Sequence, residues 1–275
     1  MSQTSFIRVA VRGQDVDLEY RWIEPQSSGP LLVFLHEGLG SVGLWRGFPT
    51  ALCQAAGCRG LVYSRAGYGN SSPFWPARHW PVDFMHVEAR EILPRVLSSL
   101  GIDTTADPPV LVGHSDGASI ALIHAAAFPD KVAGIVAMAP HIFVEPLTVE
   151  SIANIRDKVL TGDLPVRLGR YHRDVQSVFW GWAGVWLRAE FAQWEIRSLL
   201  NSIRAPALLI QGLDDEYGTT AQIQGILDAH SSASAVTLSE CGHSPHLDQP
   251  GAVIGATGRF LLEYKFGPAR PKQGQ

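Results

Sequence analysis

The chain has 275 residues, of which 46% are hydrophobic and 17% charged, so it can bury a large core within one sizeable domain. The formal net charge of −4 and the pI near 6.2 provide no basic surface of the kind that attracts nucleic acids or anionic membranes. We therefore expect no nucleic-acid partner.

The first residues alternate polar and apolar types and lack the apolar run of a secretory signal. No segment approaches the roughly 18 consecutive apolar residues that indicate a membrane span. We therefore expect a soluble, cytoplasmic protein. The three cysteines Cys53, Cys58 and Cys241 are odd in number and lack C-x-x-C spacing, which predicts plain thiols rather than disulfides or a zinc site.

In chain order, the first predicted element is an antiparallel edge hairpin at 6–24, where residues alternate with period two around a Gly13-Gln14 turn. Short apolar runs follow, and they predict central strands of a parallel sheet that is covered on both faces. The predicted strands are 30–37, 60–67, 108–115, 132–140, 205–212 and 234–240. Helical segments between or after them are predicted at 43–56, 83–100, 117–128, 219–229 and 251–265. The fold class is therefore α/β, with a mostly parallel central sheet.

Residues 141–203 interrupt this alternation. They contain no convincing strand, and helical pieces are predicted at Ile152 to Leu160, Pro165 to Trp180 and Trp182 to Ser198. We expect a helical cap, or lid, inserted into a core formed by 1–140 and 204–275. Its residues Trp180, Trp182 and Trp186 are candidates for an apolar substrate pocket, although each could simply pack the insertion against the core.

The segment Gly113-His114-Ser115-Asp116-Gly117 matches the pattern G-x-S-x-G between a predicted buried strand and a predicted helix. A sharp turn there would present Ser115 as a nucleophile, and the two glycines would remove side chains that collide. A serine hydroxyl needs a base, and the base needs a group that orients it. His243, which follows Gly242 after the last predicted strand, is the expected base, with His246 as the alternative. Asp215 or Asp214 is the expected acid.

The order Ser, Asp, His is that of α/β-hydrolases, and the sequence resembles this superfamily over nearly its whole length. The matching segments are HEGLGS (36–41), YSRAGYGNS (63–71), GHSDG (113–117), QGLDDEYG (211–218) and CGHSPHLDQP (241–250). The resemblance favours Asp215, because the acid of this family usually falls third after the glycine, here Gly212. The insertion resembles the cap of lidded esterases, lactonases and carbon-carbon bond hydrolases.

Two N–H groups should stabilise the oxyanion of the tetrahedral intermediate. The elbow geometry suggests the backbone N–H of Asp116. The resemblance suggests Gly38, or else Leu39, although Glu37 replaces the usual first glycine of that loop. We expect the side chains of Glu37 and Asp116 to face partners such as Arg65 or His36, because free negative charge would oppose an oxyanion. Alternatively, Glu37 shapes substrate choice.

These residues predict hydrolysis of a carboxylic ester, lactone or thioester through an acyl-enzyme on Ser115. The resemblance leaves open carbon-carbon hydrolysis, perhydrolysis or cofactor-free dioxygenation, and a non-enzymatic ligand receptor. Ser115 argues against dehalogenases and epoxide hydrolases of this fold, which use aspartate there. No metal-binding or nucleotide-binding motif is present, so no cofactor and no metal are expected. The expected partner is a small ester-type substrate, and the sequence does not decide between a monomer and a homodimer.

Overall fold

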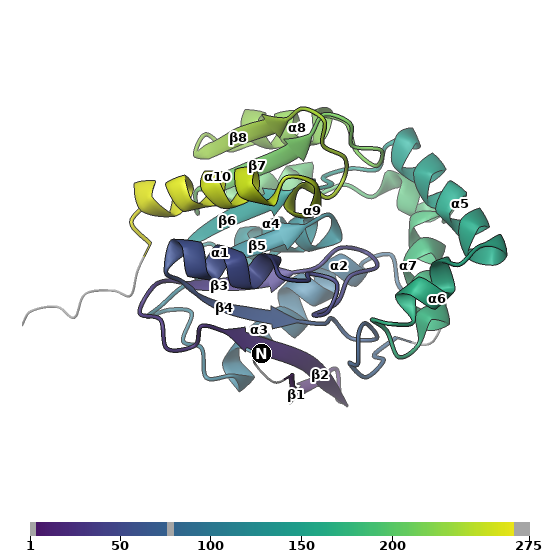
Figure 1. The fold of residues 1–275 in the computed structure, drawn as a ribbon, viewed down its shortest axis with the longest axis horizontal. Coiled ribbons are helices and arrows are strands. Elements are labelled where there is room, and N and C mark those ends of the chain that lie inside the picture. Colours follow the sequence, from purple (N-terminus) through teal and green to yellow (C-terminus); the bar gives the residue numbers. More distant parts are fainter. Residues whose placement is uncertain (1–3, 76–79, 267–275) are drawn as a thin grey trace, which may run out of the picture.

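The computed structural model describes residues 4–75 and 80–266, which contain one sheet of eight strands in the order β1-β2-β4-β3-β5-β6-β7-β8 (Figure 1). The strands are β1 (Ser5–Val11), β2 (Gln14–Ile23), β3 (Leu31–Leu35), β4 (Arg59–Tyr63), β5 (Val110–His114), β6 (Gly134–Met138), β7 (Ala207–Gly212) and β8 (Ala233–Leu238). Strand β2 pairs antiparallel with both β1 and β4, and all other neighbours are parallel. This is the predicted mostly parallel α/β sheet.

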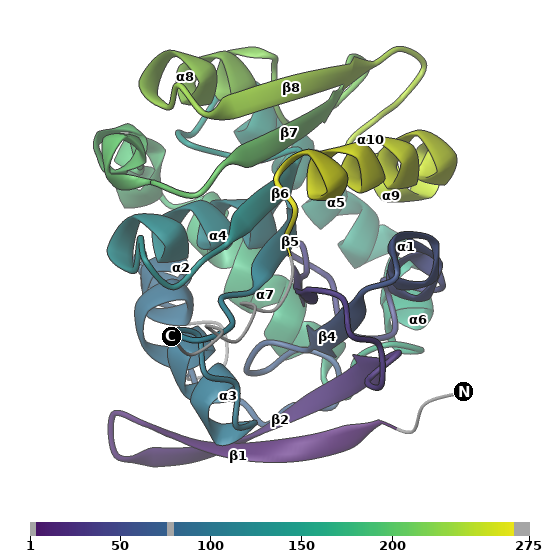
Figure 2. The same ribbon diagram turned by 90° about the vertical axis from the view of Figure 1, so that its left-hand side faces the viewer.

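The apolar runs are explained by burial on both faces of the sheet. Every residue of β3, β5, β6 and β7 is buried. The run at 234–240 is the exception, because β8 is the edge strand of the sheet and none of its residues is buried. Figure 2 shows α1 and α10 on one face and α3, α4 and α8 on the other. The helices of the core are α1 (Phe48–Ala56), α2 (Phe84–Val87), the π-helical turn η1 (Glu88–Ile92), α3 (Leu93–Ser99), α4 (Asp116–Ala127), α8 (Ala221–Ala229), α9 (Pro245–Asp248) and α10 (Pro250–Glu263).

Several predicted bounds were wrong. The hairpin turns at Arg12-Gly13, one position before the prediction, and both residues have positive φ. The helix predicted from 43 begins at Phe48, after a series of turns. The helix predicted over 83–100 is interrupted by η1, and α3 then begins with Pro94 in its first turn, where proline loses no helical hydrogen bond.

The insertion between β6 and β7 carries α5 (Pro146–Thr161), α6 (Leu164–Leu168), α7 (Val175–Trp186) and the 3₁₀ turns η2 (Ala189–Gln193) and η3 (Arg197–Ser202). Helices α5, α6 and α7 lie beyond the carboxyl ends of the parallel strands (Figure 1). The predicted helix 165–180 is two helices, because Asp174 caps a new one by accepting the Ser177 N–H at 2.9 Å. The predicted helix 182–198 was wrong, because α7 continues to Trp186 and only 3₁₀ turns follow.

One residue between α6 and α7 ties the insertion to two loops of the core. The backbone N–H of Gly69 donates to His172 Nδ1 at 2.9 Å, which leaves the ring proton on Nε2. That Nε2–H donates to the carbonyl oxygen of Leu39 at 2.8 Å. The backbone N–H of Arg173 in turn donates to the Gly69 carbonyl at 2.9 Å. The insertion is therefore hydrogen-bonded to the loops that follow β3 and β4.

Candidate active site

Ser115 lies in the sharp turn between β5 and α4, at the carboxyl edge of the sheet. Its φ of 53° and ψ of −120° are values that residues with a Cβ rarely adopt. Such a conformation costs on the order of 1–3 kcal/mol and persists only where the surroundings impose it. The Ser115 N–H donates to the carbonyl oxygen of Met138 in the neighbouring strand β6 at 2.9 Å. The strained turn directs the hydroxyl towards a cavity.

The two glycines of the turn are required by close backbone contacts. A Cβ on Gly113 would lie 2.4 Å from the carbonyl oxygen of Gly117. A Cβ on Gly117 would lie 1.9 Å from the carbonyl oxygen of Leu35 in β3. Both distances are far below van der Waals contact, so no other residue fits at either position without moving the backbone. The glycine spacing of the sequence therefore has a steric cause.

Three side chains predicted from the sequence form one hydrogen-bonded chain. Ser115 Oγ lies 2.9 Å from His243 Nε2. His243 Nδ1 lies 2.8 and 3.0 Å from the two carboxylate oxygens of Asp215. Asp215 follows β7 and His243 lies between β8 and α9, so the sheet brings together loops that are far apart in sequence. A hydroxyl, an imidazole and a carboxylate therefore lie within hydrogen-bonding distance of one another, in the order that nucleophilic catalysis by serine requires.

The Asp215 carboxylate is held by further donors. It accepts the backbone N–H groups of Tyr217 at 2.8 Å and Gly218 at 3.2 Å, and the side-chain amide of Gln211 at 2.6 Å. Burial pushes the pKa of Asp215 up, but the hydrogen bond with His243, the charge of that ring and the Tyr217 N–H outweigh burial. The net pKa lies below its ordinary value. Asp215 is therefore ionised at neutral pH.

The two alternative residues lie elsewhere. Asp214 is exposed, and its hydrogen bond is a backbone one. His246 is buried, with its ring centroid 4.9 Å from that of Trp45 and 5.4 Å from that of Phe48. Burial lowers the pKa of His246 to about 3, so the ring is neutral at ordinary pH. Neither residue is hydrogen-bonded to Ser115 or His243.

Gly38, Leu39 and Asp116, whose backbone N–H groups were the expected oxyanion donors, all line the same cavity. Within residues 4–75 and 80–266, none of the three donates a hydrogen bond to another protein group. Buried or half-buried backbone donors normally have partners. Free donors on both sides of Ser115 therefore suit an oxygen atom that the protein does not supply.

The direction of the Gly38 N–H is fixed by the carbonyl on the other side of the same peptide plane. The backbone N–H of Arg65 donates to His36 Nε2 at 3.0 Å, so the proton of this neutral ring lies on Nδ1. His36 Nδ1–H and Arg65 Nη2 both donate to the Glu37 carbonyl oxygen, each at 2.8 Å. Because C=O and N–H point in opposite directions across a trans peptide, this arrangement turns the Gly38 N–H away from Arg65.

The Glu37 side chain corrects one expectation, since its carboxylate faces neither Arg65 nor His36. Its Oε2 lies 3.5 Å from His114 Nδ1, and His114 Nε2–H donates to the His243 carbonyl oxygen at 2.7 Å. Burial pushes the pKa of Glu37 up, but the interaction with His114 and the nearby imidazoles lower it well below its usual range. Glu37 is therefore ionised at the cavity edge, with 25% of its side chain exposed.

Asp116 does face Arg65, as expected. Its Oδ2 lies 3.6 Å from Arg65 Nη2, and both side chains are almost fully buried. Burial raises the pKa of Asp116, and the charge of Arg65 and the indole N–H groups of Trp186 and Trp182 offset only part of that rise. The paired charge opposes an oxyanion less than a free carboxylate would.

The cavity has a volume of about 420 Å³. Its lining includes Glu37, Gly38, Leu39, His114, Ser115, Asp116, His141, Thr148, Ile152, Ile155, Leu164, Arg167, Trp182, Trp186, Glu216, Tyr217, His243 and Ser244. Trp182 and Trp186 are present as predicted. Trp180 is not among the lining residues, and its indole N–H donates to Gln176 Oε1 at 3.0 Å. The assignment of Trp180 to the pocket is therefore corrected.

Several lining residues were missed. His141 follows β6, and Tyr217, whose ring centroid lies 4.6 Å from that of His243, follows β7. Both could have been found by examining the residues that follow each predicted parallel strand, because these strands end at a common edge of the sheet. Thr148 and Arg167 come from the insertion and carry no sequence signal of their own.

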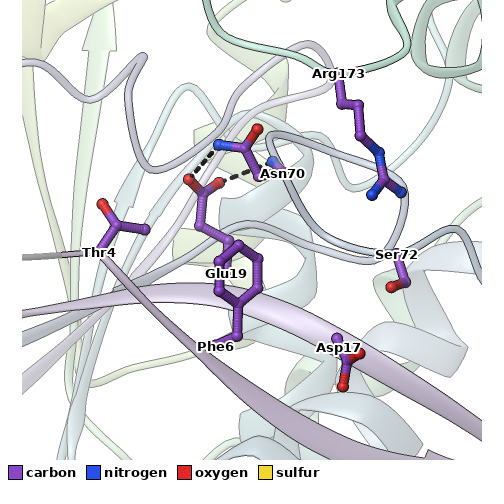
Figure 3. Close-up of a pocket in the computed structure, with 7 residues that line it drawn as sticks. All are labelled: Thr4, Phe6, Asp17, Glu19, Asn70, Ser72 and Arg173. Carbon is purple, nitrogen blue, oxygen red and sulfur yellow. Dashed lines mark hydrogen bonds between the residues drawn. The ribbon is translucent and has the colours of Figure 1, made fainter.

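A larger hollow, of about 610 Å³, lies at the β1–β2 edge (Figure 3). It is lined by Thr4, Phe6, Asp17, Glu19, Asn70, Ser72 and Arg173. The Glu19 carboxylate already accepts Ser64 Oγ at 2.7 Å, the Asn70 N–H at 3.0 Å and the Asn70 side-chain amide at 2.8 Å. The lining of this hollow contains no nucleophile beside a base. The smaller cavity at Ser115 is therefore the candidate active site.

Comparison with known proteins identifies the family and the fold. The sequence model of the alpha/beta hydrolase family matches residues 32–256, so the chain belongs to this family, whose members are hydrolases. A thermophilic esterase from Thermogutta terrifontis is similar, with TM-score 0.70 and 16% identity over 96% of this chain and 99% of that one. An enol-lactonase from Burkholderia xenovorans has TM-score 0.68 and 20% identity over 94% and 99% of the two chains. A structure from a study of carboxylesterases of Nitrososphaera gargenis has TM-score 0.74 and 17% identity over 94% and 98%. At these identities the structures show a shared fold.

None of the helices in residues 4–75 and 80–266 combines the length and the apolar character needed to cross a bilayer. In the same residues, no group of three or more His, Cys, Asp or Glu side chains is arranged to hold a metal ion.

Proposed function

We propose that this alpha/beta hydrolase cleaves carboxylic esters, including lactones or thioesters, through an acyl-enzyme on Ser115. The observation that carries the proposal is the unbroken hydrogen-bonded chain from Ser115 through His243 to Asp215, which opens into a cavity. Free backbone donors beside Ser115 support it. The substrate is a small molecule, as expected from a cavity of about 420 Å³.

The reaction has two halves. His243 Nε2 takes the Ser115 proton as Oγ attacks the ester carbonyl, and Asp215 holds the opposite ring N–H and stabilises the imidazolium. The N–H groups of Asp116 and Gly38 bind the oxyanion. His243 gives the proton to the leaving alcohol, and the acyl-enzyme remains. A water molecule, deprotonated by His243, then attacks the acyl group and releases the acid and free Ser115.

We propose different roles for the insertion and for the rest of the chain. Residues 141–203 act as a cap, and 1–140 with 204–275 as the catalytic core. Helices α5, α6 and α7 supply Thr148, Ile152, Ile155, Leu164, Arg167, Trp182 and Trp186 to the cavity. The cap therefore shapes the space available to the acyl or alcohol group, while the core carries the reacting side chains.

The test is hydrolysis of p-nitrophenyl esters from acetate to decanoate by the wild type and by Ser115→Ala, with intact mass after a fluorophosphonate probe. We expect turnover and a single adduct in the wild type, and neither in the variant. Ser119→Ala is a matched control, because Ser119 lies one turn further along α4 and bonds the His141 backbone. A wild type that neither reacts with the probe nor hydrolyses any ester would overturn the proposal.

A further inference from the structure

Arg65 is a buried cation beside the active site that the proposed reaction does not use. It lies two residues after β4, and only 2% of its surface is exposed. Its guanidinium lies over the ring of Tyr68, with 4.5 Å between Cζ and the ring centroid. Burial lowers the pKa of Arg65, but Tyr68 and two buried carboxylates raise it by more, so the side chain is charged. A buried charge is unfavourable unless it has partners, and the partners of Arg65 indicate its role.

One nitrogen of this guanidinium contacts both sides of the proposed oxyanion hole. Arg65 Nη2 donates to the Glu37 carbonyl oxygen at 2.8 Å, and the peptide that carries this carbonyl also carries the Gly38 N–H. The same Nη2 lies 3.6 Å from Oδ2 of Asp116, whose backbone N–H is the second expected donor. Among the described residues, no other Arg or Lys side chain pairs with the Asp116 carboxylate. The two expected donors therefore share a single support.

The contact with Glu37 acts through geometry. The Glu37 carbonyl oxygen has two side-chain donors, Arg65 Nη2 and His36 Nδ1, each at 2.8 Å. Because the peptide is planar, these donors hold the opposite N–H, that of Gly38, in a fixed direction. Loss of Arg65 leaves His36 as the only donor, so the peptide can turn more freely. The Gly38 N–H is then less well aligned with a developing oxyanion.

The contact with Asp116 acts through charge. The distance of 3.6 Å is longer than a hydrogen bond between charged groups, so electrostatic attraction holds the pair. Both side chains are almost fully buried, so water screens their charges little. Without Arg65, an ionised Asp116 would leave an uncompensated negative charge beside the position where the oxyanion forms. That charge would oppose the tetrahedral intermediate more than the bound, neutral ester.

We propose that Arg65 is a positioning residue of the oxyanion hole, which fixes the Gly38 peptide and neutralises Asp116 beside the nucleophile. This inference rests on the proposed ester hydrolysis and adds to it a residue that touches no reacting atom. Both contacts of Arg65 favour the negatively charged intermediate over the neutral ester. Replacement of Arg65 should therefore lower kcat on every ester and leave KM nearly unchanged.

The first test is steady-state hydrolysis of p-nitrophenyl acetate and butyrate by Arg65→Met and Arg65→Lys. We expect kcat to fall about 30-fold in Arg65→Met, within the range for loss of one hydrogen bond to a charged group. Arg65→Lys keeps the charge but not the fork of donors, so its kcat should fall only about fivefold. An unchanged kcat in Arg65→Met, or a loss that appears only in KM, would overturn the inference.

Arg59→Met is the matched control. Arg59 begins the same strand, β4, and forms an ion pair with Asp107 at the amino ends of the strands, away from Ser115. Its replacement also removes an ion pair, but kcat should stay at the wild-type value. An equal loss of kcat in Arg59→Met and Arg65→Met would mean that any lost ion pair has this effect, and would contradict the role of Arg65.

A double-mutant cycle with Asp116→Asn separates the two contacts, and it removes the buried charge that Arg65→Met leaves unpaired. In the Asp116→Asn background only the hydrogen bond to Glu37 is lost, so Arg65→Met should lower kcat about fivefold instead of about 30-fold. Equal losses in both backgrounds would contradict the neutralising role. If Arg65→Met alone does not fold, Arg65→Lys and the double variant carry the test, and an undiminished kcat in both rejects the inference.

Binding of benzeneboronic acid separates this inference from the proposed function. Ser115 Oγ adds to boron while His243 takes the proton, and the tetrahedral boronate carries the negative charge of the intermediate without any ester being hydrolysed. We expect the Kd to rise about 30-fold in Arg65→Met and to stay unchanged in Arg59→Met, as measured by isothermal titration calorimetry. That rise supports the inference even if no ester turns over. An unchanged Kd in Arg65→Met, or no binding to the wild type, rejects it even if esters are hydrolysed.

Discussion

The floor and the roof of the cavity differ in their balance of polar and apolar groups. On the floor, which the loops of the core form, the Asp215 carboxylate accepts hydrogen bonds from two backbone N–H groups, one amide and one imidazole. On the roof, which the insertion forms, the lining is mostly apolar or aromatic, with Ile152, Ile155, Leu164, Trp182 and Trp186. The floor is therefore organised by hydrogen bonds around the Ser115 hydroxyl, whereas the roof presents mainly shape and apolar surface.

This difference separates two tasks. A transition state gains most from groups that are already fixed in place, because no reorganisation is then needed during the reaction. Discrimination between substrates depends on the walls that contact the parts in which those substrates differ. Changes on the floor should therefore reduce turnover of all esters alike, and changes on the roof should alter their ranking.

The largest expected effect is on the floor. Asp215→Asn should lower kcat by about 10⁴-fold on every p-nitrophenyl ester, because the neutral amide no longer holds His243 in the required tautomer. Asp214→Asn, one residue earlier and exposed, should leave kcat unchanged. Steady-state kinetics on the ester series checks both variants. Equal losses in the two variants would contradict the hydrogen-bonded chain seen in the structure.

The next largest effect on kcat is expected at Gly38, where the floor of the cavity contacts the roof. Gly38→Ala should lower kcat by about 10²-fold, because its Cβ would lie 2.0 Å from Trp182 Nε1 and must displace either the oxyanion loop or the indole. Gly47→Ala is the control, since nothing lies within 4 Å of a Cβ there. An active Gly38→Ala would show that the loop and α7 are not in contact during turnover.

A third prediction concerns the buried side chain of His246. The folded pKa of His246, about 3, lies below the unfolded value of about 6.5. The unfolded chain therefore takes up this proton first, and stability is lost as the pH falls from about 6.5 towards 3. Between pH 7 and pH 5 the free energy of unfolding should fall by about 1–2 kcal/mol less in His246→Phe than in the wild type.

Urea unfolding at the two pH values measures this difference. Phenylalanine is the chosen replacement because the imidazole lies among Trp45 and Phe48, where another ring can pack. An identical pH dependence in the variant and the wild type would mean that His246 is not the group that titrates. Because His246 is outside the hydrogen-bonded chain, kcat at pH 7.5 should change little.

The smallest effect is expected from Glu37→Gln. Glu37 is ionised and partly exposed at the cavity edge, so removing its charge should raise kcat/KM for ethyl hydrogen succinate by about three- to fivefold, through lost repulsion. The neutral ethyl butyrate should be unaffected. Titration of the released acid at constant pH follows both substrates. A parallel change in the two esters would assign Glu37 to positioning His114 instead.

The floor could be predicted from the sequence because its constraints are local. Gly113 and Gly117 flank Ser115 at fixed spacing, since the tight turn leaves no room for side chains. Asp215 and His243 each follow a predicted strand, and parallel strands end at a common edge. The parallel sheet, covered on both faces, was predicted from the short apolar runs of its strands.

The roof could not be predicted to the same degree, because its contacts are set by packing between distant segments. Trp180 and Trp182 lie two positions apart on one helix, so they point in different directions, and the sequence does not say which side faces Ser115. Helix α7 is apolar nearly all round and therefore shows no boundary in its pattern. The partner of Glu37 was missed because His114 reaches it only through the adjacency of β3 and β5.

His172 connects the insertion to the loop that carries Gly38. Its ring joins the Gly69 N–H to the Leu39 carbonyl, and Leu39 directly follows the proposed oxyanion donor Gly38. Any displacement of the insertion away from the core must either break these two hydrogen bonds or move the loop at Gly38 and Leu39 with it. We therefore expect the placement of the insertion and the placement of the Gly38 peptide to be coupled through this ring.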